Sequence, residues 1–402
     1  MRKSTSTGRL HAAIVGGGIG GLSAANALCQ RGVQVTVYEQ AKALAEVGAG
    51  LSIFPNSLRQ LERMGFRDAL AAVGAHVGPG SEYYRMDGTV VGPILTTDSS
   101  GWNGRYGMHR ADLLEALACA LPACAIRTGH RCIGFSQDGD VARLSFANGE
   151  IVDVDVVIAA DGIHSALQKY VVEPPQPEYS GVRAYRGLVA RAKLPHWRHG
   201  AHQVWMGDDK HFMVFPVRRG ELLNYVAFVP TAGETVESWS AFGDPNELAA
   251  SFAGWDARVT ELLDKVETCF WWGLYDRRPL NSWTNGRLTL LGDAAHAMLP
   301  HLGQGANQAI EDGVALAVLL EGRAAAEVPG ILPRYEQMRR ARTDIVQAEA
   351  RQNGLRYDSR YESLAERDRE IANSVAFRKW LFDYDIEEAA IAVRDQRERV
   401  SP

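Results

Sequence analysis

The chain has 402 residues, of which 46% are hydrophobic, so it can fill the cores of more than one domain or of one large domain with an insertion. Its net charge of -5 and its 43 scattered lysines and arginines argue against nucleic acid as a partner. No apolar stretch reaches the roughly 18 residues that span a bilayer, and residues 1–7 lack the apolar region of a signal peptide, so we expect a cytoplasmic protein without a membrane partner.

A glycine-rich turn follows the first predicted strand. That strand ends at Val15, and a second strand over residues 33–38 ends before Glu39. The turn and the start of the next helix contain Gly16, Gly18, Ile19, Gly20 and Gly21. In this pattern the first glycine allows the tight turn, the second lets the backbone approach a pyrophosphate, and the last lets the helix pack on the strand. The helix N-terminus presents unpaired N–H groups to the anion, and Glu39 would bind a ribose hydroxyl. The turn therefore predicts a bound dinucleotide, NAD or FAD, with a glycine-rich loop of no special function as the alternative.

The elements that follow change character along the chain. Residues 12–72 and about 100–178 alternate strands with helices, as a doubly wound sheet requires. Residues 83–95 predict a hairpin with its turn at 86–89. Apolar runs then predict four successive antiparallel strands, a β-rich layer inserted into the cofactor fold, over residues 187–191, 202–206, 211–217 and 223–229. Residues 304–322 predict a helix, and the charged tail after Leu332 predicts further helices, with residues 359–373 as a solvated face.

Two later strands also run into glycine turns. Residues 155–165 contain the pair Asp161-Gly162, and residues 287–296 contain Gly292-Asp293. Pro300, His301 and the turn with Gly303, Gly305, Ala306 and Asn307 come shortly afterwards. With these segments in this order, residues 10 to 345 resemble the flavin-dependent aromatic hydroxylases, which are single-component FAD monooxygenases with a p-hydroxybenzoate-hydroxylase-like fold.

The resemblance implies an α/β fold with a defined organisation. An FAD-binding, Rossmann-like parallel sheet of the glutathione-reductase type would carry an inserted antiparallel β-sheet substrate domain and C-terminal helices. The FAD-binding domain would be discontinuous, over residues 10–72, 100–180 and 276–345. The β-rich substrate domain would comprise residues 73–99 and 181–275, and residues 346–402 would form the helical C-terminal segment.

The resemblance also implies which residues hold the cofactor. Glu39 and the first glycine turn would hold the ADP half of FAD, and Asp161 and Gly162 would lie near the pyrophosphate and the NADH or NADPH co-substrate. Asp293 would contact the ribityl chain, with Arg110 beside the phosphates. The turn after Pro300 would lie against the isoalloxazine ring, so that the positive N-terminal end of the next helix, near Gly305, would face the reduced flavin.

The substrate pocket is expected between that turn and the β-rich layer. His211, Met213 and Phe215 occupy alternate positions of one strand and could point into one pocket, with Tyr225 a further wall. In the family the carbonyl of the residue matching Pro300 faces the substrate hydroxyl, and related enzymes carry tyrosine where this chain has Phe215. Deprotonation of a substrate hydroxyl would therefore fall on His211 or His301. The alternative to a catalytic role for His211 is a structural one, as a buried histidine that is hydrogen-bonded to a backbone carbonyl.

An arginine is the natural partner of a substrate carboxylate because its fork of donors matches the anion. Arg183 and Arg186 are the two candidates, and either could instead hold the domain junction. Residues 271–280 resemble the salicylate-hydroxylase branch, which includes 3-hydroxybenzoate and 6-hydroxynicotinate hydroxylases.

The leading hypothesis is therefore an NAD(P)H- and FAD-dependent aromatic monooxygenase. It would use O2 to hydroxylate a small hydroxylated aromatic or heteroaromatic acid through a flavin C4a-hydroperoxide, with or without decarboxylation. The alternatives are hydroxylation of a larger phenolic natural product and a non-catalytic, flavin-binding redox sensor. The sequence leaves a monomer and a homodimer equally open.

The cysteines and histidines give no sign of a metal. Five cysteines are dispersed without a CxxC pair, which indicates reduced thiols: Cys29, Cys119, Cys124, Cys132 and Cys269. His196, His199 and His202 fall close together but have no carboxylate or cysteine nearby, so we expect no metal site.

Overall fold

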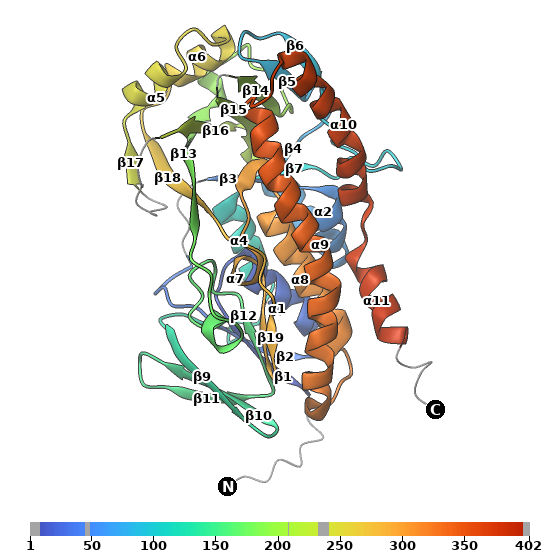
Figure 1. Ribbon diagram of the computed structural model, residues 1–402. Helices are drawn as coiled ribbons and strands as arrows, with labels where there is room; N and C mark the ends of the chain where they lie inside the picture. Colours follow the sequence, from blue (N-terminus) through green and yellow to red (C-terminus); the bar gives the residue numbers. More distant parts are fainter. Residues whose placement is uncertain (1–8, 45–48, 208, 232–240, 397–402) are drawn as a thin grey trace.

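The computed structural model describes residues 9–44, 49–207, 209–231 and 241–396 (Figure 1). A six-stranded sheet has the strand order β19-β20-β12-β1-β2-β8. Its strands are β1 (His11–Val15), β2 (Gln34–Tyr38), β8 (Ile126–Arg127), β12 (Val156–Ala159), β19 (Thr284–Asn285) and β20 (Leu288–Leu290). All neighbouring pairs are parallel except β19 with β20. Strands β1 and β12 are almost wholly buried, which explains why they read as continuous apolar runs.

Helices pack against this sheet around a shared core. Helix α1 (Ile19–Gln30) contacts α8 (Gly305–Leu320) and α4 (Arg110–Cys119). A Cβ atom on Gly313 would lie 2.7 Å from the Cα atom of Ala24, so α8 approaches α1 more closely than a larger residue would allow. The helix predicted over residues 304–322 is thus confirmed, and it lies at the centre of the molecule (Figure 1).

Two three-stranded sheets flank the six-stranded one. The first has the order β11-β10-β9 and consists of β9 (Cys132–Asp138), β10 (Val141–Phe146) and β11 (Ile151–Val154). The second has the order β3-β7-β4 and consists of β3 (Gly50–Ile53), β7 (Tyr106–His109) and β4 (Ala75–His76). Short helices accompany them: α2 (Pro55–Arg63), α3 (Arg67–Val73), α7 (Asp293–His296), and 3-10 turns at Gln168–Tyr170, Arg191–Lys193, Arg218–Gly220, Pro300–Leu302 and Ala325–Glu327.

The predicted β-rich layer is an eight-stranded sheet with the order β17-β18-β13-β16-β15-β14-β5-β6. Its strands are β5 (Glu82–Arg85), β6 (Val90–Pro93), β13 (Glu178–Ala190), β14 (Gln203–Gly207), β15 (Lys210–Val217), β16 (Leu222–Pro230), β17 (Ala241–Gly243) and β18 (Cys269–Asp276). The predicted antiparallel pairings are confirmed, and the predicted hairpin β5–β6 joins the sheet through a parallel pairing of β5 with β14.

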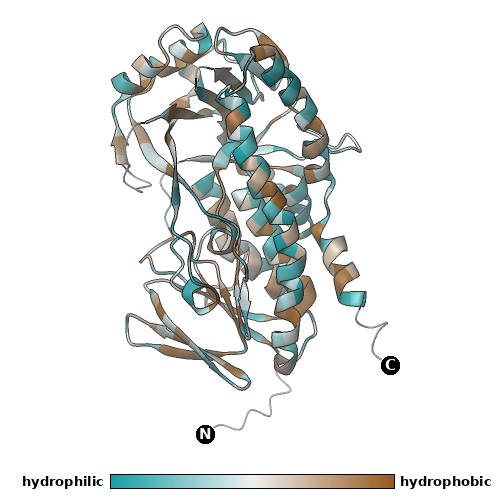
Figure 2. Ribbon diagram, viewed as in Figure 1, coloured by the Kyte–Doolittle hydropathy of each residue, from teal (hydrophilic) through white to brown (hydrophobic). Residues whose placement is uncertain are grey.

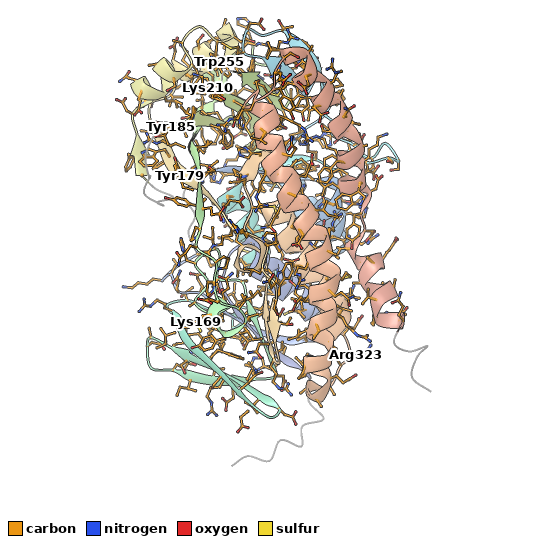
Figure 3. The ribbon with its side chains drawn as sticks, viewed as in Figure 1. Lys169, Tyr179, Tyr185, Lys210, Trp255 and Arg323 are labelled. Atoms are coloured by element: carbon orange, nitrogen blue, oxygen red, sulfur yellow. The ribbon has the colours of Figure 1, made fainter. Side chains whose placement is uncertain are left out.

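One face of this sheet is covered by α5 (Pro245–Ser251) and α6 (Ala257–Leu263), at one end of the molecule (Figure 1). Lys210 of β15 donates a hydrogen bond to the carbonyl of Ser251 and lies 6.0 Å from the ring centre of Trp255 (Figure 3). The opposite face of the sheet is therefore the one left to meet the rest of the chain.

The C-terminal helices are α9 (Val328–Tyr357), α10 (Leu364–Asp383) and α11 (Ile386–Gln396). Helix α9 runs unbroken through residues 345 and 346, where the domain boundary is predicted (Figure 1). Hydrophilic and hydrophobic residues are mixed along α9 and α10 (Figure 2). The prediction that residues 359–373 form a solvated face is wrong for Arg367 and Ile371, which are buried because α10 packs back on the molecule.

No helix in the described ranges combines the length and the apolar character needed to cross a membrane. Within those ranges, no three histidine, cysteine, aspartate or glutamate side chains gather where a metal ion could bind. The five cysteines are unpaired thiols.

Candidate active site

The first glycine turn has two glycines that the fold requires and one that it leaves open. Gly16 has φ of +111°, and a Cβ atom there would lie 2.2 Å from the carbonyl oxygen of Ala160. A Cβ atom on Gly21 would lie 2.0 Å from the carbonyl oxygen of Gly16. Gly18 precedes α1, has an ordinary φ of -76°, and has no atom within 4 Å of its Cβ position. The space in front of Gly18 therefore suits a ligand that approaches the backbone at the helix N-terminus.

Glu39 is held at the same turn. Its Oε2 atom accepts a hydrogen bond from the Gly17 N–H at 2.7 Å, and its Oε1 atom accepts one from the Ala41 N–H at 2.7 Å. These bonds fix the carboxylate beside the glycine turn, where a ribose hydroxyl is predicted to bind.

A cavity of about 380 Å³ extends from this turn to the free face of the eight-stranded sheet. Many predicted site residues line it: Gly18, Ile19, Gly20, Arg110, Gly162, Met213, Phe215, Asp293, Pro300, His301, Gly303, Gly305 and Ala306. Asp293 begins α7 and Gly305 begins α8, and a Cβ atom on Gly305 would lie 3.8 Å from an Asp293 carboxylate oxygen. The structure thus brings three glycine turns from distant parts of the chain to one cavity. The donor set and the open backbone at Gly18 fit FAD.

Five of the predicted cofactor residues are not among those that line this cavity: Gly16, Gly21, Glu39, Asp161 and Asn307. Asp161 accepts a hydrogen bond from the Ala166 N–H at 2.8 Å, and burial raises the pKa of its carboxyl group. Asn307 accepts from the Phe54 N–H at 3.0 Å and donates to the carbonyls of Ser52 and Gly303 at 2.9 and 2.8 Å. Its side-chain amide therefore joins β3 to the turn at Gly303, and contact of Asn307 with the cofactor stays a prediction.

The strand register decides which side chains of β15 and β16 reach the cavity. Met213 pairs with Val226 and Phe215 with Asn224, and these residues line the cavity. Tyr225 pairs with Val214 and, because side chains alternate along a strand, points to the other face. There it is fully buried, with its ring 5.9 Å from that of Phe212. The prediction that Tyr225 contacts the substrate is therefore wrong.

Arg183 is also outside the cavity, so its predicted contact with the substrate is wrong. Its guanidinium lies 4.2 Å from the ring centre of Trp271 and donates to the Tyr185 hydroxyl at 3.1 Å. Arg186, the alternative, occupies the opposite face of β13, lines the cavity and lies 4.8 Å from the ring centre of Trp272.

His211 lies one layer behind the cavity, which corrects the prediction that it points into the pocket beside Met213. Its ring stacks on Phe228 at 4.1 Å, and its Nδ1 atom is 2.7 Å from the Asp358 carboxylate, so the end of α9 covers this end of β15. The ring of His301, which does line the cavity, is 5.2 Å away. Burial, together with the nearby charge of His211, lowers the pKa of His301 well below its usual value. His301 is therefore neutral near pH 7.

A group of polar residues at the sheet end of the cavity has no counterpart in the sequence analysis: Tyr83, Arg105, His202, Tyr357 and Arg378. They come from β5, the segment before β7, the segment before β14, the end of α9, and α10. No local spacing links residues so far apart in the chain, and only the fold brings them together.

The chain matches the model of the FAD binding domain family over residues 9–350. It therefore belongs to this family of flavoproteins, and the predicted fold class is confirmed. It is 37% identical over 392 residues to 3-amino-4-hydroxybenzoate 2-monooxygenase PtmB3 of Streptomyces platensis, covering 94% of this chain and 97% of that protein. It is 34% identical over 405 residues to a salicylate hydroxylase of Pseudomonas putida, covering 94% of this chain and 93% of that protein.

A solved salicylate hydroxylase substrate complex has the same fold, with a TM-score of 0.85 and 29% identity over 97% of this chain and 98% of that one. Together these likenesses make the chain an FAD-dependent aromatic monooxygenase with NADH or NADPH as co-substrate, as the family resemblance implies.

Proposed function

We propose that the chain hydroxylates a small hydroxylated aromatic or heteroaromatic acid. The observation that carries this proposal is one cavity that joins the glycine turns to an aromatic pocket with buried arginines. The relatives act on 3-amino-4-hydroxybenzoate and salicylate, or on 6-hydroxynicotinate in the case of a Pseudomonas fluorescens enzyme that is 35% identical over 351 residues.

The protein supplies the environment for this reaction. When bound, FAD would pass the electrons of NAD(P)H to dioxygen and deliver one oxygen atom to the ring, the other leaving as water. Phe54, Met213 and Phe215 give the pocket apolar walls that exclude water and hold a planar ring. The bulk of these side chains favours a small substrate over a large natural product.

His301 is positioned to take the proton of the substrate hydroxyl. His301 lines the cavity, and because it is neutral, one nitrogen of its ring carries a lone pair. Asn353 donates a hydrogen bond to the His301 carbonyl at 2.7 Å, which fixes the backbone of this turn. The neighbouring carbonyl of Pro300 is proposed to orient the same hydroxyl. His211, with Asp358, would support His301 from behind.

Two further features stay proposals. The unpaired cysteines support action in a reducing compartment such as the cytoplasm. The assembly is proposed to be a monomer or a homodimer.

The test is turnover by the FAD-loaded protein with NADH or NADPH and a set of ring compounds. The set contains 3-amino-4-hydroxybenzoate, salicylate, 6-hydroxynicotinate and two larger phenolics, with products and peroxide measured together. We expect at least one small acid to accelerate NAD(P)H oxidation and to return as a hydroxylated product with little peroxide. The mass of that product decides whether the carboxylate is lost. Stimulation by the larger phenolics alone, or by no compound, would contradict the proposal.

A further inference from the structure

Two arginines at the sheet end of the cavity are buried, and neither forms a direct ion pair in the part of the chain that the structure describes. Arg105 is 2% exposed and Arg378 is 5% exposed, and both line the cavity. Within residues 9–44, 49–207, 209–231 and 241–396, neither guanidinium has a carboxylate within 4.0 Å. The Nε and Nη1 atoms of Arg105 and the Nε atom of Arg378 have no hydrogen-bond partner in that part of the chain.

Both guanidinium groups are nevertheless held in place. Arg105 donates a hydrogen bond from Nη2 to the Nδ1 atom of His202. Burial, with the charges of Arg105 and Arg378, lowers the pKa of His202 well below its usual value, so this ring is a neutral acceptor. Arg378 donates from Nη2 to the Tyr357 hydroxyl at 3.0 Å. These contacts orient the two side chains and leave other donors of each unused.

Tyr83 and Tyr357 form a hydrogen-bonded pair beside Arg378. The Tyr357 hydroxyl donates to that of Tyr83 at 3.3 Å, and the Arg378 guanidinium lies 5.8 Å from the Tyr83 ring centre. Burial acts to raise the pKa of Tyr357, but the charge of Arg378 and the hydrogen bonds of the hydroxyl group together lower that pKa. Burial acts to lower the pKa of Arg378, but Tyr83, Tyr357 and the charge of Glu349 raise it, so Arg378 remains a cation.

Two buried cations in one pocket are costly unless an anion joins them. Removing an ion from water costs several kcal/mol, which a hydrogen-bonded counter-ion offsets. Burial, with a further contribution from Arg378, lowers the pKa of Arg105 to about 10, so both arginines remain charged at neutral pH. Both side chains line the cavity, so an anion bound there would lie beside two cations.

The surroundings define the kind of anion. The Arg105 guanidinium lies 4.8 Å from the ring centre of Phe54, and the ring of Phe215 meets that of His202 at 5.6 Å, nearly edge-on. The Arg105 guanidinium and its partner His202 are therefore bordered by aromatic side chains, which suits a carboxylate carried on a planar ring.

We propose that Arg105 and Arg378 form a carboxylate-binding subsite that holds the acid group of the aromatic substrate. This inference rests on the proposed function and assigns substrate orientation to neither Arg183 nor Arg186. Tyr357 and His202 act as positioning residues for the two guanidinium groups.

The test compares binding of an acid with binding of its uncharged amide by the FAD-loaded enzyme. The probes are 3-amino-4-hydroxybenzoate with 3-amino-4-hydroxybenzamide, and salicylate with salicylamide, each titrated through the change in flavin absorbance. We expect the wild type to bind at least one acid more tightly than its amide. Arg378→Met and Arg105→Met should each weaken binding of that acid by roughly 10- to 100-fold, the loss of a charge-assisted hydrogen bond, and should change amide binding by less than about threefold. Arg378→Lys should restore part of the acid preference because it keeps the charge.

The matched control is Arg258→Met. This arginine also stacks on aromatic rings, 4.2 Å from the Tyr84 ring centre, but lies on the face of the sheet away from the cavity. The Arg258→Met variant should therefore keep the wild-type preference for the acid over the amide. The inference is overturned if the wild type shows no acid preference, if both arginine variants weaken acid and amide equally, or if Arg186→Met alone removes the preference. The titration measures binding and does not depend on product formation. If the proposed reaction fails, an acid binds but is not hydroxylated. If the subsite fails, the arginine variants do not lose the preference for the acid.

Discussion

Gly18 and Gly21 belong to the same turn but face different constraints. Gly21 is closed in by the backbone of Gly16, whereas Gly18 faces open space in front of the N-terminus of α1. The fold requires glycine at position 21, whereas at position 18 the ligand requires it. Substitution of each glycine by alanine therefore separates an effect on stability from an effect on FAD binding.

We predict that Gly21→Ala destabilises the protein with or without FAD, by about 1–3 kcal/mol, because the new methyl group overlaps a backbone oxygen. Gly18→Ala should change the stability of the FAD-free protein by less than about 0.5 kcal/mol and weaken FAD binding about tenfold or more. Urea unfolding of the FAD-free proteins and FAD titration measure both effects. Equal loss of stability in the two variants would show that Gly18 is also required by the fold.

Helix α8 is the element that holds the cavity segments together. Near its start, Asn307 bonds to the backbone of Ser52, Phe54 and Gly303. One turn later, Asp312 accepts hydrogen bonds from the Gly292 N–H at 3.0 Å and from the Nε atom of Arg339 at 2.7 Å, and lies 2.6 Å from the Nε2 atom of His296. The buried Asp312 carboxylate therefore fixes the turn that presents Asp293 to the cofactor.

The ion pairs of Asp312 predict an acid-sensitive stability. Burial acts to raise the pKa of Asp312, but the charges of His296 and Arg339 outweigh it and lower the pKa to about 2. Because the folded pKa is below the unfolded value of about 3.9, this group stabilises the fold above about pH 4 and loses that effect as pH falls toward 2. We predict that Asp312→Asn lowers the free energy of unfolding at pH 7 by about 3 kcal/mol and that the deficit shrinks at pH 3. Urea unfolding at the two pH values measures it.

Asp140→Asn is the control for this effect. Asp140 pairs with Arg287 at 2.8 Å, but its side chain is 77% exposed, so solvent screens the pair. Its removal should change the free energy of unfolding by less than about 1 kcal/mol at either pH. A deficit for Asp312→Asn no larger than that of Asp140→Asn would contradict the role given to the buried carboxylate.

At the scale of the whole molecule, local patterns predict the elements and the cofactor turns, while contacts between distant segments decide the substrate end. The turn from Gly16 to Gly21 is readable because strand, glycines and helix are adjacent in sequence. The position of Tyr225 depends on its pairing with Val214, and that of His211 on the end of α9 that covers it. Neither the strand pairing nor the contact with α9 can be predicted from the residues next to Tyr225 or His211 in the sequence.

The same reason explains why Arg105 and Arg378 escape sequence analysis. One lies before β7 and the other in α10, and each looks like an ordinary charged residue of its segment. The sequence leaves open whether the C-terminal tail covers the site. In the structure, α10 does cover the site. It supplies Arg378 to the cavity, and the ring centre of its Phe382 lies 5.4 Å from that of Phe54.

The central claim, that this cavity places an aromatic acid for hydroxylation, is tested most directly by turnover under 18O2. The FAD-loaded enzyme is supplied with NADH or NADPH and the most active small acid, and the product is analysed by mass spectrometry. We expect one labelled oxygen atom in each product molecule and close to one product for each NAD(P)H consumed. Unlabelled product, or NAD(P)H consumption that yields only peroxide with every acid tested, would contradict it.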